Sequence, residues 1–316
     1  MTSSTPRPKV SIIGAGQVGA TTTHLLALKN LADITLIDIV EGLAQGKALD
    51  LMQSAPVEGF SVTVRGTTDF AAMAESNLVV ITAGLARKPG MSREELLAAN
   101  ANIVGPLADR IAATAPNAIV IVVTNPLDIM MALVLQRTGF SRSRVMGMAG
   151  VLDSARMRLF LAQRLRVPPS AVQAMVLGSH GDLMVPLTSS ITANGKPVTD
   201  QLSSQELSQI VQRTKDGGAE IVALLKQGSA FYAPASGVVE MASAILRDTH
   251  ATLPVCAWLE GEYGLRDVCI GVPAQLGAAG IERVIEMPLT SEERMALTAS
   301  AEQVRVGIKG LTARQV

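Results

Sequence analysis

Side chains suited to binding and protonating a small anionic molecule occur at four places along the chain. Arg87 and Arg93 flank a proline–glycine segment in "ARKPGMSR", directly after the apolar run "NLVVITAG". The others are Asn125 in "VTNP", Asp153 and Arg156 in "GVLDSAR", and His180 in "GSHGD". Arginines bind carboxylates with a planar fork, and a histidine exchanges protons near neutral pH. These residue types are therefore capable of binding a carboxylate and of exchanging a proton.

Taken singly, each of these residues also has a purely structural interpretation. Asp153 and Arg156, three positions apart, could form a weak ion pair on a helix surface. Asn125 precedes a proline and could cap the next helix. Arginines on a loop are usually solvated and a lone histidine is usually structural, which is the role we assign to His24 and His250.

The elements that must position these residues begin with six short apolar runs in the first half. They are β-branched and continuously apolar, as expected for strands buried on both faces, and they alternate with segments of helical periodicity. The runs span 9–16, 33–39, 61–66, 77–84, 118–125 and 144–150. The pattern predicts an α/β fold with a doubly wound parallel sheet, which binds ligands at the carboxyl ends of its strands. Ser92 and Glu95 have the spacing of a capping box at one helix start.

The second half has a different pattern. Residues 174–182 and the segment around the Asn194–Gly195 pair predict antiparallel hairpins. Long helices are expected over about 203–227, from near Pro234 and from "TSEERMAL", with more strands over about 254–287. We therefore expect a dinucleotide-binding domain over 1–146 and an α+β substrate domain over 147–316.

The first predicted strand leads into a glycine-rich turn. Gly14, Gly16 and Gly19 form G-x-G-x-x-G before a helix, and the loop also contains Ala15, Gln17 and Val18. The glycines allow a tight turn, close approach of a pyrophosphate and close helix–strand packing. Asp38 follows 19 residues after Gly19, at the end of the second strand, where a carboxylate accepts from ribose hydroxyls and repels a 2′-phosphate. The combination predicts NAD rather than NADP.

Composition excludes several other classes of protein. The 316 residues carry 27 basic and 27 acidic side chains and are only 3% aromatic, which argues against a nucleic-acid partner. The apolar runs are too short for a membrane helix and the first residues lack a secretory pattern, so we expect a cytoplasmic protein. Cys256 and Cys269 have no metal-ligand spacing and are expected to be buried free thiols, with no metal bound.

Five motifs in register resemble the lactate/malate dehydrogenase superfamily. They are "GAGQVG", "TAGLARKPGMSREELLAANANI", "VTNPLDIM", "GVLDSARMR" and "GSHGDLMVP", and the likeness extends to "GSAFYAPASGVVEMASAIL" near the C-terminus. Within the superfamily the chain resembles the malate dehydrogenases of the lactate-dehydrogenase-like type. Ser179 stands where relatives often carry glycine or glutamate, and because it is small we expect it not to displace His180.

The resemblance implies a role for each candidate residue. His180 would exchange a proton with the C2 oxygen of a 2-hydroxy or 2-keto acid, and Asp153 would orient its ring. Arg156 would clamp the C1 carboxylate, while Arg93 would polarise the reacting carbonyl. The remaining implied contacts are Asn125 and Ser236 with substrate, and Asn100, Val123, Thr124 and Asn125 with the cofactor.

Arg87 would then decide the substrate. Relatives that act on lactate usually carry glutamine there, whereas an arginine would pair with the distal carboxylate of malate or oxaloacetate. With pyruvate, the enclosed arginine would lack a partner, at a cost on the order of 2–5 kcal/mol. The resemblance also implies a homodimer or homotetramer. The alternatives are a lactate dehydrogenase, a non-catalytic NAD-binding sensor and an NAD-using glycosidase.

Overall fold

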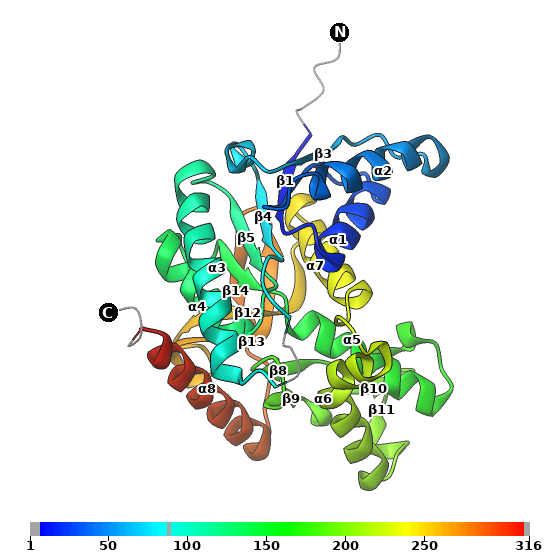
Figure 1. Ribbon diagram of the computed structural model, residues 1–316. Helices are drawn as coiled ribbons and strands as arrows, with labels where there is room; N and C mark the ends of the chain where they lie inside the picture. Colours follow the sequence, from blue (N-terminus) through cyan, green and yellow to red (C-terminus); the bar gives the residue numbers. More distant parts are fainter. Residues whose placement is uncertain (1–6, 87–89, 313–316) are drawn as a thin grey trace.

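The computed structural model describes residues 7–86 and 90–312, and its central feature is one large sheet (Figure 1). Six parallel strands from the first half of the chain form one side of this sheet. In spatial order they are β3 (Val64–Thr67), β2 (Asp33–Ile37), β1 (Lys9–Ile13), β4 (Leu78–Ile81), β5 (Ile119–Val122) and β6 (Val145–Gly147). The predicted doubly wound parallel sheet is confirmed. β1, β2, β4 and β5 end before their apolar runs do, because each run continues into the turn after its strand.

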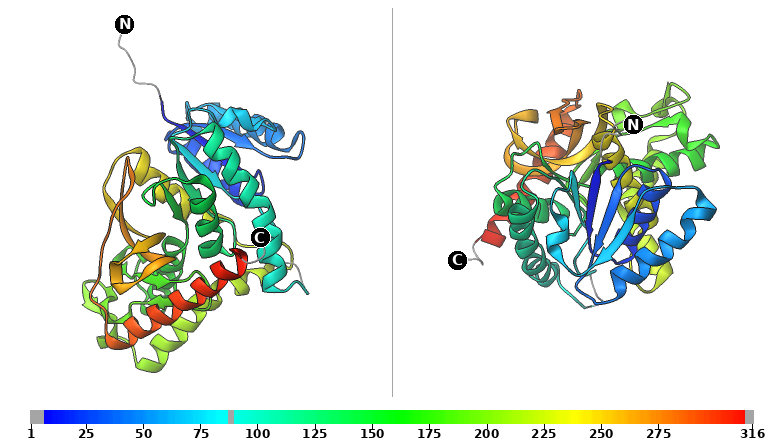
Figure 2. Two further views of the ribbon diagram at one scale, coloured as in Figure 1. Left: turned by 90° about the vertical axis from the view of Figure 1, so that its left-hand side faces the viewer. Right: turned by 90° about the horizontal axis from the view of Figure 1, so that it is seen from above.

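Helices cover both faces of the parallel strands (Figure 2). α1 (Gln17–Leu28), α2 (Leu43–Glu58) and α7 (Tyr232–Leu246) pack on one face, and α3 (Arg93–Thr114) and α4 (Leu127–Thr138) on the other. β4 and β5 lie fully buried between these two layers. Burial on both faces explains why the strands are continuously apolar.

The sheet continues into the second half of the chain, a feature that the sequence did not predict. β12 (Ala251–Glu260) joins β6 antiparallel through the single residue pair Cys256 and Gly147. Beyond β12 lie β13 (Arg266–Gly277), β8 (Val176–Gly178) and β9 (Met184–Pro186), with β14 (Gly280–Val284) also paired to β13. A Cβ on Gly147 would lie 2.9 Å from Cβ of Cys256, so a glycine lets the two halves meet.

A smaller antiparallel sheet contains β7 (Val172–Gln173), β10 (Thr192–Ala193) and β11 (Lys196–Pro197). The predicted hairpin turn is confirmed, because Asn194 and Gly195 join β10 to β11 with φ of 51° and 73°. The short 3-10 helices are η1 (Phe70–Met73), η2 (Pro169–Ala171), η3 (Thr188–Ser190), η4 (Val198–Asp200) and η5 (Glu262–Gly264).

Three further helices complete the described chain: α5 (Gly150–Leu165), α6 (Ser204–Leu225) and α8 (Ser291–Thr312). The predicted capping box is confirmed, with Ser92 and Glu95 bonding each other's backbone N–H at the start of α3. Cys256 and Cys269 are buried free thiols, as predicted. Within the described residues, every helix is too short or too polar to cross a membrane.

Candidate active site

The glycine turn after β1 uses each of its three glycines differently. Gly14 has φ of +106°, and a Cβ on Gly19 would lie 1.8 Å from the Gly14 carbonyl oxygen. Thr82, at the end of β4, donates to that same oxygen at 3.0 Å and fixes the turn to the sheet. A Cβ on Gly16, in contrast, would have no described atom within 4 Å. The first and third glycines are thus required by the fold itself, and the second leaves space for a ligand.

The surroundings of this turn fit a dinucleotide. α1 begins at Gln17 with Gly16 as its N-cap, and its described first turn has neither a side-chain cap nor an acidic residue. Its N–H groups are therefore available to a pyrophosphate. Asp38 accepts from the backbone N–H of Ala15 at 2.6 Å and of Val40 at 2.9 Å. Each carboxylate oxygen keeps a second lone pair, which a ribose hydroxyl could use.

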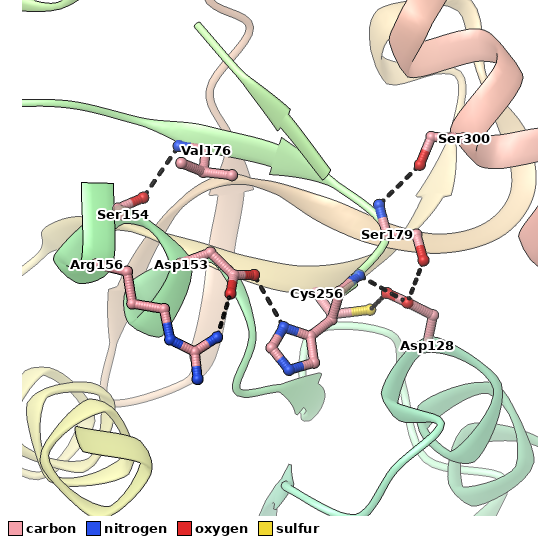
Figure 3. Close-up of polar contacts among 9 residues, drawn as sticks. Asp128, Asp153, Ser154, Arg156, Val176, Ser179, Cys256 and Ser300 are labelled. Atoms are coloured by element: carbon pink, nitrogen blue, oxygen red, sulfur yellow. Dashed lines mark hydrogen bonds and ion pairs between the residues drawn. The ribbon is translucent and has the colours of Figure 1, made fainter. Parts of the chain in front are cut away.

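Asp153 and Arg156 lie side by side on α5 (Figure 3), and His180, in the loop after β8, contacts Asp153. His180 Nδ1 lies 2.8 Å from Asp153 Oδ2, and Arg156 Nη1 donates to Asp153 Oδ1 at 3.4 Å. The Asp153 side chain is only 3% exposed and that of Arg156 13%. A surface ion pair is therefore the wrong interpretation of these two residues. Asp153 instead links the imidazole to the guanidinium inside the protein.

The charges around His180 change its protonation. Burial is the largest single influence and lowers the pKa of His180, as does Arg156. The opposing effects of Asp153 and Asp128 together outweigh them, so the net pKa is raised above its ordinary value. Burial lowers the pKa of Arg156, and Asp153 partly offsets that effect. The site thus favours an imidazolium, which shares the carboxylate of Asp153 with the Arg156 guanidinium.

A second buried carboxylate, Asp128 on α4, holds the loop of His180 from the opposite side (Figure 3). Its Oδ2 accepts from the backbone N–H of His180 at 3.0 Å and from Ser179 Oγ at 2.9 Å. The Cys256 thiol donates to Oδ1 at 3.3 Å, and burial raises the pKa of Asp128. Ser179 does not displace His180, whose ring contacts Asp153; its hydroxyl and the N–H of His180 instead share one carboxylate oxygen of Asp128.

Sequence reasoning missed Asp128, although it lies within the "VTNPLDIM" motif. Its only local signal is an acidic residue in the first turn of an otherwise apolar helix. Two serines fix the loop and the strand before it: Ser300 on α8 accepts from the backbone N–H of Ser179 at 2.8 Å, and Ser154 on α5 accepts from that of Val176 in β8 at 3.0 Å. The loop is therefore tied to three helices.

Arg93, the first residue of α3, contacts the same loop from outside. Its Nη2 lies 2.5 Å from Oδ2 of Asp182, two residues after His180, and both side chains are mostly exposed. This pair brings the beginning of α3 to the mouth of the His180 site. Arg87 lies outside the described residues, so the structure does not place it.

Asn100, Thr124 and Asn125 join the ends of β4 and β5. Asn100 is fully buried; its Nδ2 donates to the Asn125 carbonyl at 2.6 Å, and its Oδ1 accepts from Leu85 N–H at 2.7 Å. Thr124 donates to the Ala83 carbonyl at 2.6 Å. Asn125 is exposed and does not cap α4, whose N-cap is the following proline. The amide of Asn100 is thus engaged by the backbone, while Asn125 and the half-buried Val123 remain accessible.

Ser236 lies apart from this constellation. It is an exposed residue on α7, and its hydroxyl donates to the Tyr232 carbonyl at 3.0 Å. Among the described residues it has no hydrogen bond to His180, Asp153 or Arg156. The structure therefore brings together His180, Asp153 and Arg156, places Arg93 at their edge, and leaves Ser236 outside their hydrogen-bond network.

Comparison with known proteins assigns the chain to a family. Residues 8–147 match the family model of the lactate/malate dehydrogenase NAD binding domain. Residues 150–315 match that of the lactate/malate dehydrogenase alpha/beta C-terminal domain. The chain belongs to the lactate/malate dehydrogenase family. NAD is accordingly its cofactor, in agreement with the glycine turn and Asp38.

Members of this family with similar sequences cover almost the whole chain. A malate dehydrogenase from Roseiflexus sp. is 52% identical over 307 residues, which are 97% of this chain and 99% of that protein. A malate dehydrogenase from Nostoc punctiforme is 53% identical over 302 residues, 96% of this chain and 92% of that protein. The likeness therefore extends over both halves of the chain.

Solved structures from the family have the same fold. Cryptosporidium parvum malate dehydrogenase superimposes with a TM-score of 0.95 at 43% identity, covering 97% of this chain and 99% of that one. The lactate dehydrogenase of the same organism, complexed with lactic acid and NAD, also gives 0.95 at 39% identity, covering 98% and 99%. The same fold therefore occurs in a malate dehydrogenase, whose substrate has two carboxylates, and in a lactate dehydrogenase, whose substrate has one.

Proposed function

We propose that the protein is an NAD-dependent malate dehydrogenase, which oxidises (S)-malate to oxaloacetate reversibly. The observation that carries the proposal is the buried arrangement in which Asp153 contacts both His180 and Arg156. Such a constellation fits an acid/base next to a carboxylate clamp. Relatives that are 52% and 53% identical are named malate dehydrogenases, which favours a dicarboxylate over lactate.

His180 performs the proton transfer. Because Nδ1 faces Asp153, the other ring nitrogen, Nε2, remains to exchange a proton with the C2 oxygen of the substrate. During oxidation Nε2 accepts the hydroxyl proton, and the resulting imidazolium is stabilised by Asp153; during reduction the same proton returns to the oxygen. When bound, NAD accepts or supplies the hydride at C2.

The arginines hold and polarise the substrate. Arg156 makes one long hydrogen bond of 3.4 Å to Asp153 through Nη1, so the remaining N–H groups of its fork can bind the C1 carboxylate with two hydrogen bonds. Arg93 leaves its ion pair with Asp182 when substrate binds, and then stabilises the negative charge that develops on the C2 oxygen. Asn125, exposed at the end of β5, donates to a substrate oxygen.

Arg87 selects the dicarboxylate. It would pair with the distal carboxylate of oxaloacetate when the segment between β4 and α3 covers the substrate. A monocarboxylate would leave this cation enclosed and unpaired, which disfavours pyruvate. The proposal for Arg87 rests on its type and place in the sequence.

Assembly and location complete the proposal. A homodimer or homotetramer is supported by exposed apolar side chains on α2, where Leu49 is 61% and Val57 86% exposed. We place the functional division of the chain near residue 146, inside β6, and the enzyme in the cytoplasm with a role in the tricarboxylic acid cycle. Light scattering of the purified protein would separate the two assemblies from a monomer.

The activity is tested by following NADH oxidation with oxaloacetate. Replacing His180→Asn keeps the size and polarity of the side chain but removes the proton donor, and should lower kcat by about 10²- to 10⁴-fold. The matched control is His250→Asn, on an exposed histidine that bonds Glu282. Turnover that survives in the His180 variant would refute the role of this residue.

A further inference from the structure

Two consecutive glycines lie in the interior of α6, at positions 217 and 218. Neither has a positive φ, so the backbone does not require glycine there. Apart from proline, glycine is the least favourable residue in a helix interior. The residues that pack against α6 must therefore explain why glycine occurs there.

What lies against Gly217 is the side chain of Arg156. A Cβ built on the buried Gly217 would lie 3.1 Å from Arg156 Cδ and 3.3 Å from its Nε. Carbon atoms in ordinary contact are about 3.5–4.0 Å apart, so this space is too small for a methyl group unless Arg156 moves. The same face of α6 carries Thr214, whose hydroxyl contacts Met157 Sδ at 3.2 Å, so α6 packs closely on this part of α5.

Gly218 differs from its neighbour in the part of Arg156 that it meets. A Cβ there would lie 3.7 Å from Arg156 Nη2, which is an ordinary contact. An alanine therefore fits at 218 without displacing the arginine, and at 217 it does not. Positions 217 and 218 are thus a matched pair: both are glycines in α6, but only an alanine at 217 would displace Arg156.

Contact with α6 matters because Arg156 has few polar contacts with the described residues. The guanidinium has one long hydrogen bond to a described residue, 3.4 Å to Asp153. A long side chain with one weak polar contact would sample several rotamers if its stem were free. The backbone of α6 at Gly217 lies against the aliphatic part of the Arg156 side chain and restricts its conformation. This contact determines where the guanidinium lies relative to His180.

We propose that Gly217 is a positioning residue that sets the guanidinium of Arg156 for recognition of the substrate C1 carboxylate. The inference rests on the proposed function, in which Arg156 binds that carboxylate. A methyl group at 217 displaces the aliphatic part of the Arg156 side chain by a few tenths of an ångström. The planar guanidinium then no longer lines up with both oxygens of the substrate carboxylate. Small misplacements of such clamps have large effects on binding.

The test compares Gly217→Ala with Gly218→Ala in the full-length enzyme. We expect Gly217→Ala to raise KM about tenfold for oxaloacetate and for pyruvate alike, with a smaller change in kcat, because both substrates share the C1 carboxylate. Gly218→Ala should keep the KM of the wild type. The Kd for NADH should not change in either variant, and Tm should be equal or higher because alanine favours the helix.

Three results would overturn the inference: an unchanged KM in Gly217→Ala, an equal rise in both variants, or a lowered Tm that places the effect in helix packing. A double-mutant cycle with Arg156→Lys adds a second readout. The two changes should be strongly non-additive if Gly217 acts through the fork, and additive if it does not. Failure of the proposed function looks different, since the wild type itself would then fail to reduce either 2-keto acid.

Discussion

The glycine turn after β1 and the His180 loop after β8 are both short segments that follow a strand, but different contacts hold them. The shape of the turn depends on close packing of its backbone, where a Cβ on Gly19 would meet the Gly14 carbonyl at 1.8 Å. The His180 loop is fixed by polar side chains from α4, α5 and α8. A local motif is sufficient for the first, whereas the second needs residues up to 121 positions apart in the chain.

The difference predicts which kind of substitution disrupts the structure of each segment. Removal of a side chain should disrupt the His180 loop, because its buried donors would lose their acceptors. Addition of a side chain should disrupt the glycine turn, because the backbone packs too closely at Gly14 and Gly19 to leave space for a Cβ. Three experiments test this comparison.

The largest effect is expected for Asp128→Ala. It leaves the His180 N–H, the Ser179 hydroxyl and the Cys256 thiol without their acceptor, which should lower the free energy of unfolding by about 3–5 kcal/mol. Asp128→Asn retains one oxygen for His180 and should lose less than half of that. Urea denaturation measures both. Equal losses in the two variants would show that the buried charge, rather than its hydrogen bonds, holds the loop.

Gly19→Ala and Gly16→Ala form the corresponding pair in the turn. Gly19→Ala forces the backbone apart and should cost at least about 3 kcal/mol of stability. Gly16→Ala has space for its methyl group, so it should keep the Tm and instead weaken NADH binding, by at least tenfold in Kd, because the pyrophosphate approaches there. Thermal unfolding and NADH fluorescence separate the two outcomes. A stable Gly19→Ala protein would contradict the packing argument.

The smallest effect concerns pH. The raised pKa of His180 keeps the ring protonated to higher pH than usual. In reduction the enzyme needs that proton, so kcat/KM for oxaloacetate should be flat at low pH and fall about tenfold per pH unit above the pKa. Oxidation of malate should show the opposite trend. Asp153→Asn removes the charge that raises the pKa and should move the midpoint to lower pH; an unmoved midpoint would assign the titration to another group.

The sequence was sufficient for the elements that local patterns determine. Apolar runs, the Ser92 capping box and the Asn194–Gly195 turn act over a few residues, and the structure contains all three. The union of both halves into one sheet was not predicted, since it depends on a single pair between Gly147 and Cys256. No periodicity marks that contact.

The candidate site shows the same limit. His180, Asp153 and Arg156 were found because family motifs contain them, and their distances follow from the fold. Asp128 and Gly217 were missed because their importance lies in contacts with segments about 50–60 residues away. A buried acid in an apolar helix and a glycine pair in a helix interior are the only local signs of them.

The central claim, malate dehydrogenase activity with Arg87 as the selector, is tested most directly by kcat/KM for oxaloacetate and pyruvate at saturating NADH. We predict that the wild type prefers oxaloacetate, and that Arg87→Gln shifts the ratio toward pyruvate by about thirtyfold or more. Lys88→Gln, which removes a neighbouring charge, should leave the ratio unchanged. A wild type that prefers pyruvate, or a ratio that Arg87→Gln does not move, would contradict the account.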